Sequence, residues 1–143
     1  MKITSKTLYA IKFMVNLAST YELRTMSVSE IAGIESISEK FLENIVASLK
    51  AKGLVKVKRG AKGGYFLAKS PQRIAMREVI EAVEADRLTF EWDGKENSSI
   101  DLALYNLFSE LNNSIVNFLE SKTLDDLLNQ LDALKPNNQM FYI

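Results

Sequence analysis

The residues best suited to chemistry in this sequence are cations that lie close together. Between Asn44 and Arg77 the chain holds nine lysines and arginines and no acidic residue, whereas the whole protein of 143 residues has a formal net charge of zero. Ammonium and guanidinium groups at this density bind phosphate oxygens, so the segment indicates a surface for a polyanion. A solvated surface without a ligand is the alternative, and the choice depends on where the fold places these charges.

The charges also divide the chain into two unequal halves. Residues 1–85 carry fourteen basic and eight acidic side chains, and residues 86–143 carry four basic and ten acidic ones. We therefore expect the first half to contact the polyanion and the second half to serve another purpose.

No catalytic or metal-binding set of residues accompanies the cations. The sequence contains neither cysteine nor histidine, which removes disulfides, thiolate nucleophiles, imidazole bases and the usual ligands of iron–sulfur clusters. The acidic residues form no pair with a spacing typical of acid–base catalysis. No apolar run approaches the roughly 18–20 residues that span a bilayer. We expect a cytoplasmic protein that is not an enzyme and has no metal or other cofactor.

Two short helices joined by a tight turn are predicted beside the basic segment. Ser27 has the form of a capping box with Glu30 and starts a helix that ends near Gly33, and Ser38 caps a second helix, 39–52. This spacing is that of a helix-turn-helix, whose second helix presents its N-terminal outer face to the DNA major groove. A helical hairpin that only packs is the alternative. The outer face consists of Ser38, Glu39, Lys40, Glu43 and Asn44.

A β-hairpin is predicted directly after these helices. Residues 54–59 alternate apolar and basic side chains, residues 60–64 are a glycine-rich turn, and a return strand begins at Tyr65. The alternation leaves Val55 and Val57 for the core. A hairpin in this position is a wing, and an arginine at its tip suits the negative potential of the minor groove. The wing carries Lys56, Lys58, Arg59 and Lys62.

Four further helices frame this unit. Residues 4–20 form an amphipathic helix with Leu8 and Val15 on its apolar face, and residues 73–85 form another. Residues 98–120 form the longest helix, and Thr123 caps a last one through Leu134. The longest helix repeats apolar residues at steps of three and four, close to a coiled-coil seam. They are Ile100, Leu104, Leu107, Leu111, Ile115 and Phe118. Pairing of this seam with a second copy predicts a homodimer, and an intramolecular cover helix is the alternative.

Two segments leave their interpretation open. The loop 86–97 contains Phe90 and Trp92, which either pack beneath the loop or line a pocket for a small molecule. The tail 136–143 is polar and then apolar, and it either tucks onto its own dimer or serves as a ligand for a partner protein. The apolar part is Met140, Phe141, Tyr142 and Ile143.

Several motifs together resemble the Rrf2 family of bacterial winged-helix transcription regulators. They are Ile31-Ala32, Ile37 to Glu43, Gly53-Leu54-Val55, Arg59-Gly60, Gly63 to Leu67 and Val79 to Glu84. The resemblance is dense from residue 1 to about residue 85 and looser in the long helix. It implies a homodimer on a palindromic operator, usually a repressor. The DNA contacts that it implies are Lys2, Thr4, Ser5, Lys6, Ser38, Lys40, Phe41, Glu43, Asn44, Arg59 and Gly60.

The chain departs from the family in two ways, and its ending resembles that of one particular kind of member. Thr7-Leu8 stands where members often have Gly-Arg, which weakens the expected N-terminal contacts. Many members hold an iron–sulfur cluster on three cysteines before the long helix, and residues 92–104 contain none, so no cluster sensor is expected. The ending Met140 to Ile143 resembles that of a cluster-free repressor of cysteine metabolism. This implies control of sulfur-amino-acid genes and a partner, cysteine synthase (O-acetylserine thiol-lyase), that captures the tail.

The sequence thus predicts a mainly α protein with a small β-hairpin (α+β). A winged helix-turn-helix domain occupies residues 1–85, a loop 86–97, dimerisation helices 98–135 and a tail 136–143. A protein-interaction module built on the same scaffold, or a regulator of another pathway that senses a small molecule, remains the alternative function.

Overall fold

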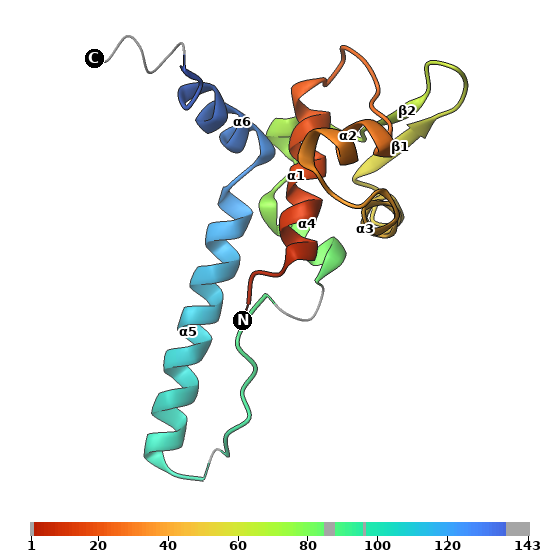
Figure 1. Ribbon diagram of the computed structural model, residues 1–143. Helices are drawn as coiled ribbons and strands as arrows, with labels where there is room; N and C mark the ends of the chain where they lie inside the picture. The colour runs from red at the N-terminus through yellow and green to blue at the C-terminus, as the bar shows by residue number, and fades with distance from the viewer. Residues whose placement is uncertain (1, 85–87, 96, 137–143) are drawn as a thin grey trace.

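The computed structural model describes residues 2–84, 88–95 and 97–136 (Figure 1). A compact body of helices and one antiparallel hairpin carries a long helix that projects from it, which confirms the predicted fold class. The elements are α1 (Ser5–Ser19), α2 (Val28–Glu35), α3 (Glu39–Ala51), β1 (Val55–Lys58), β2 (Gly64–Leu67), the 3-10 helix η1 (Pro71–Arg73), α4 (Met76–Val83), α5 (Ser99–Ser121) and α6 (Leu124–Ala133).

Helix α1 lies at the centre of the body and contacts α3, α4, α6 and β2. Its fully buried side chains include Phe13, Met14 and Leu17. The predicted apolar face was wrong at its edge, because Leu8 is exposed and Val15 is only half-buried. A helix surrounded by several elements buries a broad face, and the position of that face depends on neighbours that a single periodicity does not reveal.

The helix-turn-helix forms as the spacing predicts. The Ser38 hydroxyl accepts the backbone N–H of Phe41 at 3.3 Å and so begins α3. Helix α2 continues to Glu35, two residues beyond the expected Gly33, and ends where Ser36 adopts a left-handed conformation with φ of 56°. Four apolar residues of α3 are buried as expected: Leu42, Ile45, Val46 and Leu49.

The hairpin pairs Val55 with Leu67 at its base and Lys58 with Gly64 near its tip. A single bridge between Met26 and Tyr65 joins it to the segment before α2. The Gly64 backbone lies so close to this segment that a Cβ there would stand 2.8 Å from the Met26 carbonyl carbon. The expectation that Val57 enters the core was wrong, since its side chain is 37% exposed. The hairpin extends past the body, so only its base meets the core.

The segment before α4 also differs from the prediction. A continuous helix was expected from Arg73, but η1 ends there and α4 begins only at Met76. Ile74 is fully buried between the two helices, and its carbonyl accepts the N–H of Leu124 at 3.0 Å. The N–H of Met76 donates in turn to the Lys122 carbonyl at 2.7 Å. Residues 74–76 and 122–124 therefore form a short two-stranded joint between the body and the α5–α6 corner.

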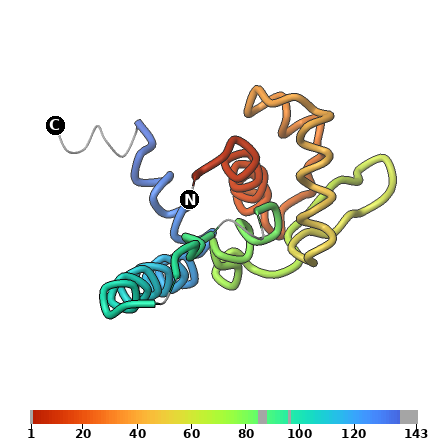
Figure 2. The backbone as a smooth tube through the Cα atoms, turned by 90° about the horizontal axis from the view of Figure 1, so that it is seen from below, coloured from red at the N-terminus to blue at the C-terminus, as the bar shows by residue number. Residues whose placement is uncertain are grey.

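Helix α5 stands apart from α3 and the hairpin. Seen from below, it lies at one side of the body, and α3 and the hairpin lie at the other (Figure 2). Its contacts with the body include α4, and none of its residues is buried. Among the described residues, no helix is long and apolar enough to cross a lipid bilayer.

Candidate nucleic-acid interface

The outer face of α3 is open to solvent along its first two turns. All five of its predicted contact residues are exposed: Ser38, Lys40, Phe41, Glu43 and Asn44. Within the described part of the chain, the side chains of Lys40, Glu43 and Asn44 take part in no hydrogen bond or ion pair. Their donors and acceptors are therefore available to a ligand, while the opposite face of α3 anchors the helix in the core.

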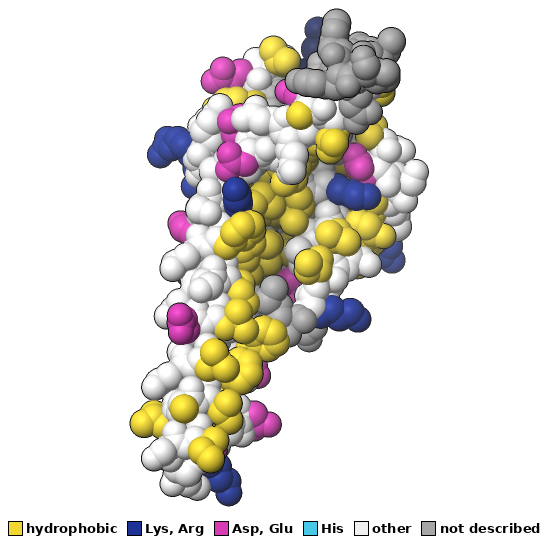
Figure 3. Space-filling model, turned by 90° about the vertical axis from the view of Figure 1, so that its left-hand side faces the viewer, with side chains coloured by type: hydrophobic (Ala, Val, Ile, Leu, Met, Phe, Trp, Pro, Cys, Tyr) yellow, Lys and Arg dark blue, Asp and Glu magenta, His cyan; other side chains and the backbone are white. Residues whose placement is uncertain are grey.

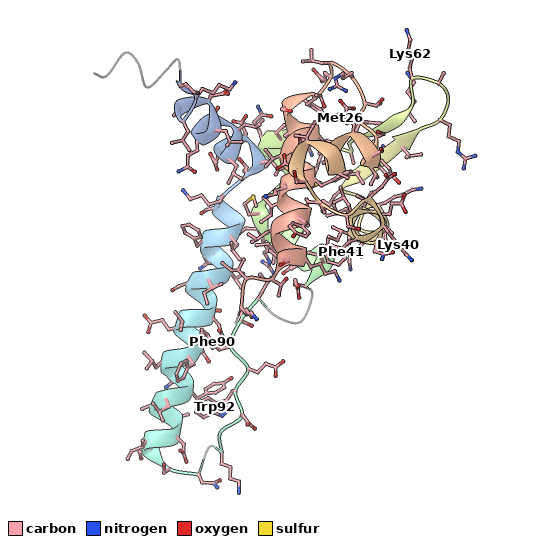
Figure 4. The ribbon with its side chains drawn as sticks, viewed as in Figure 1. Met26, Lys40, Phe41, Lys62, Phe90 and Trp92 are labelled. Atoms are coloured by element: carbon pink, nitrogen blue, oxygen red, sulfur yellow. The ribbon has the colours of Figure 1, made fainter. Side chains whose placement is uncertain are left out.

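Phe41 contacts α1. The side chain is 40% exposed, and its ring meets the Tyr9 ring edge-on, with centroids 5.7 Å apart and planes at 84°. Figure 4 places Phe41 on the side of α3 that faces α1. The family resemblance implied Phe41 as a DNA contact but did not indicate its contact with Tyr9, because the pair forms only when α1 and α3 pack together.

The hairpin carries exposed cations that have no carboxylate partner among the described residues. They are Lys56, Lys58, Arg59 and Lys62. The turn is closed by the Gly63 N–H, which donates to the Gly60 carbonyl at 2.9 Å, and Gly60 has a φ of 114° that favours glycine. The Thr25 hydroxyl donates to the Lys62 carbonyl at 3.0 Å and ties the tip to the body. Lys62 points away from the body at the end of the hairpin (Figure 4).

Other cations near this surface are neutralised within the molecule. Arg24 donates two hydrogen bonds to the Glu30 carboxylate, at 2.8 and 3.0 Å. The hydrogen bond from Arg24 lowers the pKa of the Glu30 carboxyl. This carboxylate was expected to complete a capping box with Ser27, and it binds Arg24 instead. Lys69 pairs with Glu78, and Arg77 with Glu81. Within the basic segment, Lys69 and Arg77 are thus paired inside the molecule, whereas the four hairpin cations and Lys50, Lys52 and Arg73 form no ion pair among the described residues.

The residues of the N-terminal stretch differ in whether they are free to bind a ligand. Lys2 and Ser5 are exposed, and Lys6 is half-buried. The Thr4 hydroxyl accepts the Thr7 N–H at 3.2 Å and donates to the Glu84 carboxylate. Thr4 therefore caps α1 and ties it to the end of α4, which occupies the hydroxyl proton that a phosphate contact would use.

The loop before α5 lies along that helix and is held by two kinds of contact. The Phe90 N–H donates to the Asn112 side-chain oxygen and the Asn112 amide donates to the Phe90 carbonyl, both at 2.8 Å. The Phe90 ring packs on Phe108 at 6.2 Å, and Trp92 meets Tyr105 edge-on at 5.7 Å (Figure 4). We call these four rings the aromatic clasp. They confirm packing beneath the loop, and the buried Trp92 indole nitrogen has no hydrogen-bond partner among the described residues.

The predicted seam of α5 is uncovered. Hydrophobic side chains run along α5 and continue onto the body (Figure 3). Ile100, Leu107 and Phe118 are more than half exposed, Leu104 and Leu111 are exposed to a lesser degree, and Ile115 is half-buried. Helix α5 fully buries none of its residues, and although Leu119 packs against the core, the predicted seam is not covered by the described part of the chain. The predicted partner-binding residues Met140 to Ile143 lie outside the described residues.

An exposed polar recognition helix beside a basic hairpin defines a winged helix-turn-helix DNA-binding protein. The Rrf2 family profile, described as "Iron-dependent Transcriptional regulator", matches residues 3–130. This chain belongs to the Rrf2 family of transcription regulators.

Relatives with established names agree with this assignment. The HTH-type transcriptional regulator CymR of Bacillus subtilis is 33% identical over 143 residues, which span the whole of both chains. The HTH-type transcriptional regulator IscR of Pectobacterium carotovorum is 34% identical over 136 residues, 94% of this chain and 83% of its own. The solved structure of CymR, described as the global cysteine regulator of B. subtilis, superposes with a TM-score of 0.81 at 32% identity, covering 91% of this chain and 98% of that one.

The description of the family implies iron, and the residues of this chain do not fit an iron–sulfur cluster. Such clusters are held by cysteine thiolates, with histidine in some centres, and the sequence has neither residue. Within the described ranges, no group of three or more acidic side chains is placed to hold a metal ion. The loop 88–95 instead places Phe90 and Trp92 against α5.

Proposed function

We propose that this transcription regulator is a homodimeric repressor that binds a palindromic operator through α3 and the hairpin. The observation that carries the proposal is the hairpin itself, whose four cations have no carboxylate partner in the described structure and stand beside the open face of α3. Unpaired cations on one projecting element bind phosphate without first breaking an internal ion pair.

The chemistry of α3 suits base recognition. Lys40 can donate to guanine, Glu43 can accept from the cytosine amino group, and Asn44 can bind adenine. Each is exposed on the N-terminal half of α3, the part that enters the major groove in this class of protein. Arg59 at the hairpin tip matches the narrow, negative minor groove.

The dimer follows from the seam of α5. Six apolar side chains at steps of three and four lie exposed or half-buried on one projecting helix. Burying them against the same helix of a second copy contributes on the order of 10 kcal/mol before entropic costs. An interface between identical helices is closed by a two-fold axis, which matches the symmetry of a palindrome.

The pathway under control is the cysteine and sulfur metabolism of the cell. Full-length similarity to a global cysteine regulator supports this. The absence of cysteine and histidine from the sequence, which does not fit an iron–sulfur cluster, supports it too. We propose that the protein acts without such a cluster. Under the same proposal the tail residues 140–143 bind cysteine synthase. IscR relatives are equally similar, so the operator must decide the pathway.

The experiment is selection of genomic duplex fragments by the purified protein at moderate salt. A palindrome upstream of cysteine, methionine or sulfur-uptake genes supports the whole proposal, and one upstream of unrelated genes retains the repressor and rejects the sulfur pathway. We expect the dimer to make about six to eight phosphate contacts with the selected operator. A plot of the logarithm of the association constant against the logarithm of the salt concentration should then have a slope of about −5 to −7. A slope near zero contradicts binding dominated by phosphate.

Deletion of residues 140–143 tests the partner separately. We expect loss of cysteine synthase binding with unchanged dimerisation and operator affinity. Retained binding of cysteine synthase rejects the role of the tail. Tight binding of cysteine synthase by a protein that selects no operator would instead favour the protein-interaction module.

A further inference from the structure

We propose that Tyr9 of α1 is a DNA-contacting residue: its hydroxyl donates a hydrogen bond to a backbone phosphate, and its ring positions Phe41 against the methyl group of a thymine. The inference rests on the proposed DNA-binding function and extends the interface along α1, one turn beyond the implied contacts Ser5 and Lys6. Tyr9 is not among the contacts that the sequence indicated.

The position of Phe41 is fixed from two sides. Its backbone N–H donates to the Ser38 hydroxyl in the first turn of α3, and its ring meets the Tyr9 ring edge-on at 5.7 Å. Edge-to-face pairs of this kind are favoured by the quadrupoles of the two rings. The part of the Phe41 ring that remains exposed lies on the helix that enters the major groove, where a phenyl ring contacts the thymine methyl group.

The Tyr9 hydroxyl is free to bind a ligand. Its ring packs against the hydrophobic core, yet the hydroxyl has no hydrogen-bond partner among the described residues. The oxygen also reaches solvent, because the buried side-chain atoms left without a partner do not include it. Tyr9 therefore presents a hydroxyl donor at the surface, while its ring is held in place by the hydrophobic core.

The surroundings of this hydroxyl favour an anion. Ser5 and Lys6 precede Tyr9 by one helical turn, and Lys12 follows it by one turn, so the three share its face of α1. Neither lysine forms an ion pair in the part of the chain that the structure describes. A hydroxyl donor between two unpaired cations is suited to bind a phosphate oxygen. In helix-turn-helix proteins the sugar–phosphate backbone of the DNA runs beside the N-terminus of the recognition helix.

Three variants separate the two roles of Tyr9. Tyr9→Phe removes only the hydroxyl, and Tyr9→Leu removes the edge-on ring. Tyr105→Phe is the control, since Tyr105 lies in α5, where its ring contacts Trp92. Binding is measured to the selected operator, to a scrambled duplex and to operators in which each thymine of a half-site is replaced by uracil. The thermal midpoint of every variant is recorded to confirm folding.

We expect Tyr9→Phe to weaken binding to operator and scrambled DNA alike, by about threefold to tenfold, as for the loss of one hydrogen bond. The salt slope stays unchanged, because a neutral hydroxyl releases no counterion. The wild type should prefer thymine over uracil at one position of each half-site, and Tyr9→Leu should lose that preference while it remains folded. Tyr105→Phe should behave as the wild type.

Each part of the proposal has its own contrary result. Wild-type affinity of Tyr9→Phe for both duplexes overturns the phosphate contact. A preference for thymine that survives in Tyr9→Leu, or that is absent from the wild type, overturns the positioning of Phe41. Should Tyr9→Leu fail to fold, Phe41→Leu replaces it, and a thymine preference retained in that variant has the same meaning. Failure of the wild type to select any operator rejects the proposed function itself.

Discussion

Arg59 stands at the point where the hairpin turns, and its environment explains why one side chain there can matter so much. It is exposed, it has no acidic partner in the described structure, and it is followed by Gly60, whose positive φ sharpens the turn. A guanidinium on a narrow turn reaches further into a groove than one on a helix. Lys62, on the other side of the turn, is held through its carbonyl by Thr25.

Replacement of Arg59 by alanine is therefore expected to weaken operator binding by about 1–3 kcal/mol. The loss arises because the minor groove concentrates negative potential around an inserted arginine. Fluorescence anisotropy with a labelled operator measures it. Lys95→Ala removes an exposed cation from the loop before α5 and should leave the affinity unchanged. Equal effects of the two substitutions would show that only total charge matters.

Single residues of the site could be read from the sequence where one element determines their exposure. The cap at Ser38 fixes the phase of α3, so its outward residues follow from helical periodicity. Tyr9 could not be found in this way, because its importance lies in a contact between two helices. The capping role of Ser27 was predicted, but the attraction of Arg24 for Glu30 depends on the turn that brings them together.

At the scale of elements, the start of α4 shows how tertiary contacts override local preference. The Glu78 carboxylate accepts the Ala75 N–H at 2.8 Å and the Lys69 ammonium at 2.7 Å. Burial raises the pKa of the Glu78 carboxyl, whereas the hydrogen bonds from Lys69 and Ala75 lower it, and the net result is a lowered pKa. The helix begins where these bonds and the joint with residues 122–124 place it, not at the first residue with helical periodicity.

Glu78→Gln should reduce the free energy of unfolding at pH 7 by about 0.5–1.5 kcal/mol, because the ion pair is lost and the bond to Ala75 is weakened. The folded pKa of Glu78 lies below its unfolded value, so its contribution is complete above the unfolded pKa and is lost as the pH falls through the folded one. Urea denaturation at several pH values should show the two curves converging in acid. Glu110→Gln is the control, because it removes an exposed acid of α5 that has no ion-pair partner among the described residues. A difference that persists unchanged at low pH would contradict this origin.

The loop before α5 is a second element whose position depends on few contacts. Asn112 accepts from and donates to the backbone of Phe90, and Trp92 is the only tryptophan of the chain. Asn112→Ala should loosen the aromatic clasp and expose the Trp92 indole, which shifts its emission to longer wavelength. Asn113→Ala, at the next exposed position of α5, should leave the spectrum unchanged. Identical spectra for the two variants would show that ring packing alone holds the loop.

At the scale of the whole molecule, α5 lies apart from α3 and the hairpin, so the proposed dimer interface and the proposed DNA-binding surface belong to different parts of the fold. The sequence predicted both parts, because each has its own periodicity and charge. It could not predict the joint that links them, since the pairing of Ala75 with Thr123 spans residues far apart in the chain and leaves no local pattern. Val57 was misplaced for a similar reason, because alternation does not reveal how far a hairpin extends beyond its core.

The exposed seam predicts how the molecule assembles. Leu107→Asp places a charge in the middle of the seam and should convert a dimer to a monomer, with a severe loss of operator affinity because one half-site is no longer tethered to the other. Light scattering after size-exclusion chromatography measures the mass. Leu23→Asp is the matched control, since Leu23 is 80% exposed but lies in the turn before α2. A dimer that survives Leu107→Asp would place the interface elsewhere.

The joint between residues 74–76 and 122–124 has a consequence for the operator of the proposed dimer. Backbone hydrogen bonds from both segments hold the α5–α6 corner to the body. If two chains pair along α5 as proposed, the distance between their two DNA-binding surfaces is therefore fixed. Each added base pair turns one half-site by about 35° around the duplex axis, since the helix repeats every 10–10.5 base pairs. A dimer of fixed geometry cannot follow that rotation. The protein should therefore discriminate between half-site spacings as strictly as between bases.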